Sequence, residues 1–484
     1  MTTASTLGSA ASVRHLKDLP GPRPWPVVGN ALQLDRSRIH LDIERWAAQY
    51  GEAFRMRLGK REVLVVSSHE AISNAMRDRP EGFRRPSGLA RIIGELGMAP
   101  GLFVAEGEHW QRQRRMVMAA FSPTHIRAYF PQLKRVAERF RGRLDKAVAS
   151  GQPVPLQADL MRFTVDVITG LAFGQETNTI EAEGDILQQH MDRIFPMLFK
   201  RLNSIFPVWH YFKTEEDRVL ERSVHEVVQA IEHFMREARA RLAADPTRRA
   251  QPPNLIEALI VASEAPDSGM TEDDVVGNVF TMLLAGEDTT ANTMAWLLDL
   301  LWRQPQALRK AVEEARRVVL PFEALTMDGV GELHYLDACI NEAMRLKPVA
   351  PFRMLEALKP QVVAGVQVDA GTMVWCVSRH DSLSEACFEA AREFRPERWL
   401  EEDTAAQQGQ ASVKRVSIPF GAGPRVCPGR YLAMVEMKLC LGMLLAHFDI
   451  DSVDTPDGQP AQEVMNFTMT PLGQRLRLKR AVAP

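Results

Sequence analysis

One cysteine, Cys427, stands in a segment whose neighbours an ordinary buried thiol would not need: Phe-Gly-Ala-Gly-Pro-Arg-Val-Cys-Pro-Gly, residues 420–429. Pro428 follows the cysteine directly, and the apolar residues after it recur with helical spacing. Proline is favoured at the first position of a helix, so the pattern predicts Cys427 at the helix N-cap. Unpaired backbone N–H groups and the positive end of the helix dipole favour a thiolate there.

The residues around Cys427 suit a loop that presents a thiolate to a flat ligand. Gly421, Gly423 and Gly429 permit backbone conformations and close approaches that are barred to other residues. Arg425 supplies a permanent cation for a nearby anion. A buried cysteine in a glycine-rich turn would explain any one of these features, but not all of them together.

The segment resembles the haem-binding loop of the cytochrome P-450 family, because it matches the pattern Phe-x-x-Gly-x-Arg-x-Cys-x-Gly at every fixed position, Gly423 and Gly429 included. The resemblance implies that Cys427 is the axial thiolate ligand of the iron of haem b. It also implies that Arg425 binds a haem propionate and that Phe420 packs beside the sulfur. Thiolate ligation pushes electron density onto the iron and favours O–O cleavage.

An acid and a hydroxyl stand side by side in an apolar predicted helix over residues 271–303. Burying such groups unpaired is expensive, so their presence needs a reason. The segment Ala-Gly-Glu-Asp-Thr-Thr resembles the oxygen-activating helix of the family. The resemblance implies that Ala285 lies against the haem, that Gly286 leaves room for dioxygen, that Asp288 relays protons and that Thr289 hydrogen-bonds the oxygen under activation. A helix bulge satisfied by threonine back-bonding is the alternative.

Two further motifs occur in the order that the family has them. Glu342 and Arg345 form Glu-x-x-Arg, which places both on one helix face, and Arg398 matches the arginine that completes the family's buried Glu-Arg-Arg network. Trp110 and Arg114 match the Trp-x-x-x-Arg helix, and the resemblance implies that both donate to a haem propionate. Taken alone, each motif is more often a solvated helix face.

Three features stay open at this level. Arg112 and Arg115 are candidates for contact with an acidic redox partner. Arg353 lies earlier than the family's usual propionate-binding arginine of that region, so it receives no role. The aromatic-rich residues 194–212 fit a mobile lid over the pocket, an ordinary packed helix pair or, last, a segment in shallow contact with a membrane.

The fold is predicted to be mainly α with small β-sheets near the two ends of the chain. We expect one large haem-binding domain over residues 19–484, after a flexible N-terminal segment of residues 1–18. The resemblance implies that the haem is buried between the long central helix and the helix after the cysteine loop. The remaining periodic segments predict a hairpin at residues 53–67. They predict four further helices at residues 109–120, 125–150, 160–173 and 215–244, and short strands at residues 361–368, 373–377 and 474–478.

Composition and charge limit the partners and the cellular location that we expect for this chain. The formal net charge of -2 gives no general attraction to nucleic acid. Five cysteines, an odd number without a Cys-x-x-Cys pair, favour a reducing, cytoplasmic location over a disulfide framework. The apolar residues 275–302 could span a bilayer by length, but the adjacent Glu287 and Asp288 would be costly in lipid. We therefore expect a soluble monomer without a transmembrane anchor.

The predicted function is a monooxygenase that inserts one atom of dioxygen into a hydrophobic small molecule, by hydroxylation or epoxidation. Without fused redox domains, electrons from NAD(P)H would come through a ferredoxin or flavodoxin and its reductase, as in a bacterial-type system. The resemblance implies that the pocket walls lie at residues 84–104 and 195–212, near Ala285, after Pro348 and at residues 467–469. The alternatives are a haem-thiolate peroxygenase, isomerase or dehydratase, and last a non-catalytic haem-binding protein.

Overall fold

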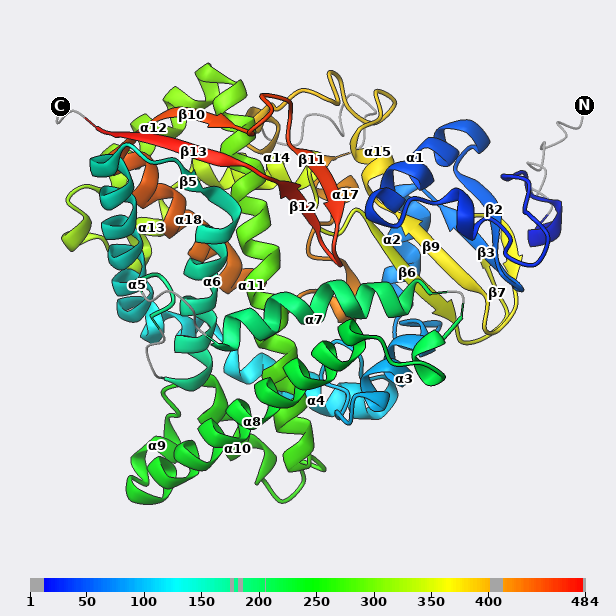
Figure 1. The fold of residues 1–484 in the computed structure, drawn as a ribbon, viewed down its shortest axis with the longest axis horizontal. Helices are drawn as coiled ribbons and strands as arrows, with labels where there is room; N and C mark the ends of the chain where they lie inside the picture. Colours follow the sequence, from blue (N-terminus) through cyan, green and yellow to red (C-terminus); the bar gives the residue numbers. More distant parts are fainter. Residues whose placement is uncertain (1–12, 175–177, 182–185, 205, 401–411, 482–484) are drawn as a thin grey trace, which may run out of the picture.

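The computed structural model describes residues 13–174, 178–181, 186–204, 206–400 and 412–481. Helices fill most of the molecule, and small sheets lie toward its edges (Figure 1). The predicted fold class, mainly α with small sheets, is confirmed. Of the expected flexible segment, residues 1–12 lie outside the described residues, while Arg14–His15 forms a short strand.

The predicted helices are present, with ends shifted by at most a few residues. The α-helices are α1 (Ile39–Tyr50), α2 (His69–Arg77), α3 (Ser87–Glu95), α4 (Gly107–Ala120), α5 (Pro123–Ser150), α6 (Leu156–Phe173), α7 (Ile186–Leu202), α8 (Glu215–Ala244), α9 (Thr247–Ala250), α10 (Leu255–Ser263), α11 (Glu272–Arg303), α12 (Pro305–Val319), α13 (Met327–Gly331), α14 (His334–Leu346), α15 (Arg379–Ser382), α17 (Val413–Val416) and α18 (Arg430–His447).

In the part of the chain that the structure describes, the strands form four small sheets. In sheet order they are β2 (Ala53–Leu58), β3 (Arg61–Val66), β9 (Met373–Val377), β6 (Phe352–Ala357) and β4 (Phe83–Arg84); β1 (Arg14–His15), β8 (Val366–Val368) and β7 (Gln361–Val363); β10 (Phe448–Asp454), β13 (Arg475–Arg480) and β5 (Val154–Pro155); and β11 (Gln462–Met465) with β12 (Met469–Leu472). The predicted hairpin at residues 53–67 is the antiparallel pair β2–β3.

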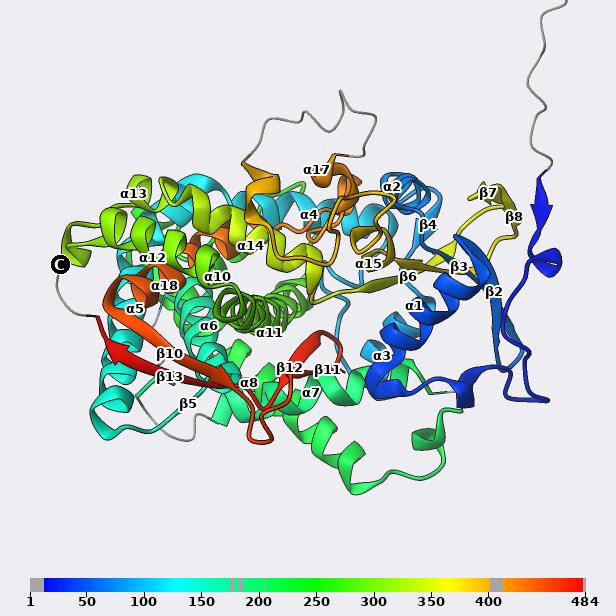
Figure 2. The same cartoon turned by 90° about the horizontal axis from the view of Figure 1, so that it is seen from above.

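The long helix α11 runs through the centre of the helical part, and Figure 2 looks nearly along its axis. It begins with a capping box between Thr271 and Asp274. Apolar side chains cover most of its circumference, which is the pattern of a helix buried on all sides. It packs against α6, α8, α14 and α18. None of the helices in the described part of the chain is both long and apolar enough to cross a bilayer.

A buried charge network anchors the β11–β12 hairpin beside α11. Glu463 on β11 accepts a hydrogen bond from Arg379 at 2.9 Å, lies 2.9 Å from the His40 ring and pairs with Lys347. Burial opposes ionisation of Glu463. The hydrogen bonds from His40 and Lys347 and the charge of Arg379 nevertheless hold the pKa of this carboxyl well below its usual range. The hairpin is thereby tied to α1, α14 and α15.

The Glu463 network should make stability sensitive to acid. A carboxyl whose pKa is lowered in the folded state stabilises the protein above its unfolded pKa of about 4.3 and loses that contribution as pH falls below it. We expect Glu463→Gln to lower the free energy of unfolding by about 2 kcal/mol at pH 7. The difference from the parent should shrink between about pH 5 and pH 3.

Urea unfolding at several pH values measures this effect. Glu216→Gln is the matched control, because that carboxylate pairs with Lys200 but is 64% exposed. A pH-independent deficit in Glu463→Gln would contradict the role of the ionised carboxylate.

Candidate active site

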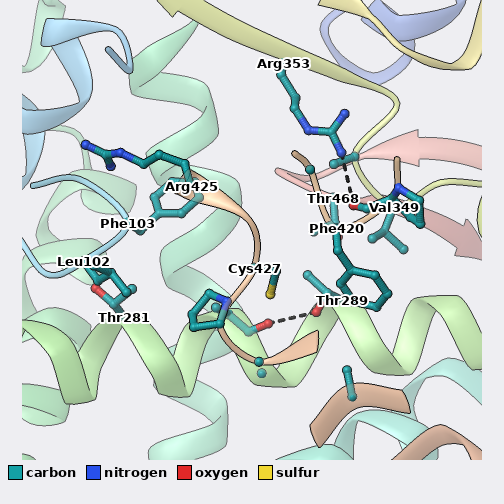
Figure 3. A pocket seen from close by; sticks show the side chains of 18 of the residues that line it. Leu102, Phe103, Thr281, Thr289, Val349, Arg353, Phe420, Arg425, Cys427 and Thr468 are labelled. Atoms are coloured by element: carbon teal, nitrogen blue, oxygen red, sulfur yellow. Dashed lines mark hydrogen bonds between the residues drawn. The ribbon is translucent and has the colours of Figure 1, made fainter. Parts of the chain in front are cut away.

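A cavity of about 410 Å³ lies between α11 and the cysteine loop that precedes α18. The loop forms one wall, and the turn of α11 that carries Ala285 and Thr289 forms the opposite wall. In Figure 3 the sulfur of Cys427 points toward this turn of α11. The structure therefore brings together the two segments that the sequence singled out, although they lie more than one hundred residues apart.

The cysteine loop directs backbone N–H groups at the sulfur. The amides of Gly429 and Arg430 both donate to the Cys427 thiol, and the amide of Cys427 itself donates to the carbonyl of Phe420 at 2.9 Å. The prediction that Cys427 is the N-cap of the helix is wrong, since α18 begins at Arg430 and its N-cap is Gly429. Pro428 lies in the turn before the helix, and this turn allows the first amides of α18 to reach back to the sulfur.

The ionisation of Cys427 differs from the expectation for an N-cap thiolate. Burial raises the pKa of the Cys427 thiol, while the amides of Gly429 and Arg430 and the charge of Arg114 act in the opposite direction. Desolvation prevails, because the cost of burying the thiolate exceeds the stabilisation that these amides and the charge of Arg114 provide. A metal ion at the sulfur would deprotonate it outright.

The backbone geometry explains why two positions of the loop, Gly421 and Gly423, are glycines. Gly421 and Gly423 both have positive φ angles, of 77° and 71°. A Cβ at Gly423 would lie 2.7 Å from the carbonyl oxygen of Met76, so the loop packs directly on the end of α2. Gly429 differs, because a Cβ there would meet the Cys427 sulfur at an ordinary 3.9 Å.

Among the described residues, five arginines line the same cavity: Arg79, Arg85, Arg114, Arg353 and Arg425. The sequence analysis predicted a haem-binding role for Arg114 and Arg425 and gave no role to Arg353. It did not single out Arg79 or Arg85. No local pattern marks the missed pair, because each arginine reaches the cavity through tertiary packing of the segment between α2 and α3. Gathering so many guanidinium groups around one space is unfavourable unless an anion joins them.

Arg425 is affected by charge repulsion from the other arginines of this cluster. It pairs with Glu106, and its guanidinium carbon lies 4.4 Å from the ring centroid of Trp110. Burial lowers the pKa of Arg425 to about 10; Glu106 opposes the shift, while the charges of Arg79 and Arg114 add to it. The neighbouring cations are therefore only partly compensated by Glu106.

Arg353 connects the cluster to the cysteine loop. Its guanidinium donates to the carbonyls of Ile418 and Pro419 at 3.0 and 3.1 Å and to the hydroxyl of Ser378 at 3.1 Å. The side chain lies at the edge of the cavity, as Figure 3 shows. Arg353 thus lies at the same site as the predicted Arg114 and Arg425, although it comes earlier in the sequence than the usual arginine of this region.

Comparison with known proteins identifies the family. The family model described as "Cytochrome P450" matches residues 19–478. The chain belongs to the cytochrome P450 family. It is therefore a haem-thiolate monooxygenase, an oxidoreductase that carries haem and uses dioxygen.

Relatives align over nearly the whole of this P450. The Caenorhabditis elegans protein named as cytochrome P450 CYP13A7 is 27% identical, across 96% of this chain and 94% of its own length. Cytochrome P450 83A1 of Arabidopsis thaliana is also 27% identical, across 94% of this chain and 90% of its own length. The chloroplastic carotene epsilon-monooxygenase of Arabidopsis thaliana is 25% identical, across 86% of this chain and 77% of its own length.

The residues of the cavity fit a haem. Nε and Nη2 of Arg79, and Nε and Nη1 of Arg425, are buried without a hydrogen-bond partner among the described residues. Buried donors of this kind are rare unless a ligand supplies the acceptors. The two propionate carboxylates of haem are suitable acceptors, and the Cys427 sulfur lies on the same cavity as the arginines.

The acid and the hydroxyl of α11 do not face the same space. Thr289 lines the cavity and donates its hydroxyl to the carbonyl of Ala285 at 2.9 Å. Asp288 is 7% exposed and lies behind the cavity wall, where its carboxylate accepts hydrogen bonds from Thr468 and, at 2.7 Å, from Asn292. Sequence reasoning missed both partners of Asp288, and Asn292 alone had a detectable signal, its i,i+4 spacing.

Gly286 has a packing role. A Cβ at this position would lie 2.9 Å from Cγ1 of Ile168 on α6. The glycine thus permits the close approach of α6 to α11, and it also lines the cavity, where room for dioxygen stays a prediction. Ala285, one residue earlier, exposes its methyl group to the cavity.

The Glu-x-x-Arg motif forms the predicted network beneath the site. Glu342 and Arg345 make a bidentate pair at 2.7 and 2.8 Å, and neither side chain is exposed to solvent. Arg398 lies 3.4 Å from the same carboxylate. Trp399, which sequence reasoning missed, donates its indole N–H to it at 2.9 Å. The network joins α14 to the segment that leads toward the cysteine loop.

The described part of residues 194–212 combines a packed helix with an exposed end. Phe195 on α7 stacks on Phe467 with ring centroids 4.8 Å apart. Beyond α7, Tyr211 is 81% exposed, while Trp209 donates to Glu95 at 3.0 Å. The segment therefore covers the cavity through packed aromatic contacts.

The two basic residues proposed for partner contact differ in exposure. Arg115 on α4 is exposed to solvent, while Arg112 is half-buried, beside Gly269 and 3.8 Å from Glu108. Arg115 is the one with a free approach from solvent.

Proposed function

We propose that this P450 hydroxylates or epoxidises a hydrophobic small molecule, with Cys427 as the residue whose thiolate would hold the iron of haem b. The supporting observation is one cavity that combines an amide-supported sulfur with guanidinium donors that lack partners among the described residues. The haem, when bound, supplies electron storage and the activation of dioxygen. The alternative reactions, peroxygenation, isomerisation and dehydration, use the same scaffold but need no proton delivery.

Each cofactor-binding residue has a distinct task in this proposal. Arg114, Arg425 and Trp110 bind the propionates, and Arg79, Arg85 and Arg353 join them. Phe420, Gly423 and Gly429 shape the loop around the sulfur. Ala285 and Gly286 form the distal wall over the haem.

The proton supply comes from α11. Asp288 holds a proton close to the cavity, and Thr289 accepts a hydrogen bond there while its own hydroxyl proton is directed to Ala285. Preorganised groups of this kind lower the barrier to proton transfer. Asp288 and Thr289 are thus the proposed catalytic residues.

The walls of the cavity favour an apolar substrate. The five predicted regions each contribute an apolar side chain to the cavity, and these include Leu102, Phe103, Leu202, Met282, Val349 and Phe467. An apolar pocket of this kind stabilises its ligand through buried hydrophobic area. Hydrophobicity is the only substrate property that these residues specify.

Redox partners complete the proposal. A ferredoxin or flavodoxin with its reductase would transfer electrons from NAD(P)H, as separate proteins of a bacterial-type system. The exposed Arg115 is suited to an acidic partner surface. All five cysteines are free thiols, which is compatible with the cytoplasm. We further propose that residues 19–484 form one domain and that the protein acts as a monomer.

Thr289→Ala should separate oxygen reduction from product formation. Without the hydroxyl, proton delivery loses its organised acceptor, so we expect product formation to fall at least about 10-fold while hydrogen peroxide release rises. The measurement is reductant-dependent oxygen consumption with product and peroxide quantified together. Thr281→Ala is a matched control, because Thr281 lines the cavity two turns earlier and donates to Gly277 at 2.7 Å.

Two results would contradict the proposal. Unchanged product and peroxide in Thr289→Ala would remove this residue from proton delivery. Product formation from hydrogen peroxide alone, with none from dioxygen and reductant, would assign the protein to the peroxygenases.

A further inference from the structure

The hydroxyl of Thr468 contacts Asp288 and also lines the cavity. We infer that Thr468 transfers protons between the Asp288 carboxyl and the cavity, as a positioning residue for proton delivery. This inference rests on the proposed monooxygenase function. It concerns a residue of the β11–β12 turn, outside the acid and hydroxyl of α11.

The geometry around Asp288 supports this path. The carboxylate is buried behind the cavity wall, so it needs an intermediary to reach the space where oxygen is activated. Its Oδ2 accepts the hydroxyl of Thr468, and its Oδ1 accepts the side-chain amide of Asn292 at 2.7 Å. Thr468 is 5% exposed and stands at the cavity surface. Its oxygen therefore connects the buried acid to the cavity.

Thr289 does not supply the same connection. Its hydroxyl donates to the carbonyl of Ala285, one turn back along the helix. The proton of Thr289 is thus directed along α11, while that of Thr468 is directed at the carboxylate. Figure 3 shows Thr468 and Thr289 coming from different elements on the same side of the pocket.

The backbone of the turn holds Thr468 in place. Phe467 has a φ angle of 86°, which is strained for a residue with a side chain. Met469, the residue after Thr468, donates its amide to the carbonyl of Val349 at 2.8 Å, and its own carbonyl accepts the indole N–H of Trp296 at 3.1 Å. Strain of this kind persists where the surroundings over-determine a conformation, and it concentrates at functional sites.

The proton transfer balances without a further reactant. Protonated Asp288 gives its proton to Oγ1 of Thr468, and the hydroxyl of Thr468 gives its own proton to a water molecule or acceptor in the cavity. Thr468 ends unchanged, and Asp288 becomes a carboxylate that takes a new proton from solvent. The threonine oxygen loses its original O–H bond to the acceptor in the cavity and gains a new O–H bond with the proton from Asp288.

The hairpin offers a matched control. Thr470 is 6% exposed, lies on the same hairpin and accepts a hydrogen bond from Asn292 at 3.1 Å. It is not among the residues that line the cavity in the described part of the chain. Thr470→Val therefore replaces a threonine hydroxyl by a methyl group, as Thr468→Val does, without removing a group from the proposed path. Thr468→Ser is the second control, because it keeps a hydroxyl at position 468.

The first measurement tests the path in the haem-loaded enzyme. With dioxygen and reductant, we expect Thr468→Val to lower the ratio of product to peroxide about 10-fold. Thr468→Ser should recover most of the ratio, and Thr470→Val should stay near the parent. An unchanged ratio in Thr468→Val, or an equal loss in Thr470→Val, would overturn the inference while leaving the monooxygenase function intact.

The second measurement tests the contact without turnover. In a double-mutant cycle on urea unfolding of the haem-loaded protein, Thr468→Val should shift the midpoint more in the parent than in Asp288→Ala, where Thr468 keeps only the hydrogen bond from Asn292 at 3.1 Å. Equal shifts in both backgrounds would overturn the hydrogen bond on which the path depends. A parent enzyme that forms no product from dioxygen would instead overturn the proposed function, and the inference with it.

Discussion

Cys427→Ser is expected to abolish thiolate ligation while leaving a folded protein. A serine hydroxyl can still accept from the amides of Gly429 and Arg430, so the loop keeps its hydrogen bonds. The oxygen cannot supply the electron density that a thiolate pushes onto iron. We expect substrate oxidation to fall at least about 10³-fold, which corresponds to about 4 kcal/mol of transition-state stabilisation.

The spectrum of the reduced carbon monoxide complex measures this ligation directly. The long-wavelength Soret band of a thiolate-ligated haem should be lost in Cys427→Ser. Cys387→Ser is the matched control, since this half-buried thiol lies beside His69 and Asp381, away from the cavity. A thiolate-type spectrum that survives in Cys427→Ser would remove Cys427 from the iron.

Glu342→Gln is expected to give the largest loss of stability. Glu342 is the carboxylate between Arg345 and Arg398, and the side chain of Arg345 is 0% exposed. Removing the negative charge leaves a buried guanidinium without its counter-ion, which costs about 3–5 kcal/mol. Because the network supports the segment before the cysteine loop, haem content per chain should fall as well.

Urea unfolding and the ratio of haem to protein measure this prediction. Glu215→Gln is the control, because Glu215 pairs with Arg218 and Arg222 but its side chain is 67% exposed. The control should behave as the parent does. If Glu342→Gln matched the parent in both measurements, the buried network would not be a determinant of folding.

Features encoded in short segments could be predicted from the sequence. Helical spacing located α11 and α8 almost to the residue, because each carries its own apolar period and capping box. The Cys427 loop was recognisable for the same reason, since its glycines and Arg425 lie within ten residues. Its helix boundary was misplaced, because the preference of proline for a helix start is statistical and the amides of α18 turn toward the sulfur.

Features that depend on distant contacts could not be predicted. Arg79 and Arg85 reach the cavity only after α2 and α3 have packed, and nothing adjacent in the sequence marks them. Thr468, one of the hydrogen-bond partners of Asp288, lies 180 residues away on a hairpin that the Glu463 network anchors. The reason for Gly286 required the position of Ile168 on another helix.

The five arginines around the cavity have a consequence for the stability of this protein without its cofactor. A newly synthesised chain must bring these like charges together, with Glu106 as a partial counter-ion. A ligand that binds only the folded chain stabilises it by mass action, and a doubly anionic cofactor also relieves the repulsion. Haem binding would therefore stabilise the folded chain, so protein without haem should unfold at a lower urea concentration than the haem-loaded protein.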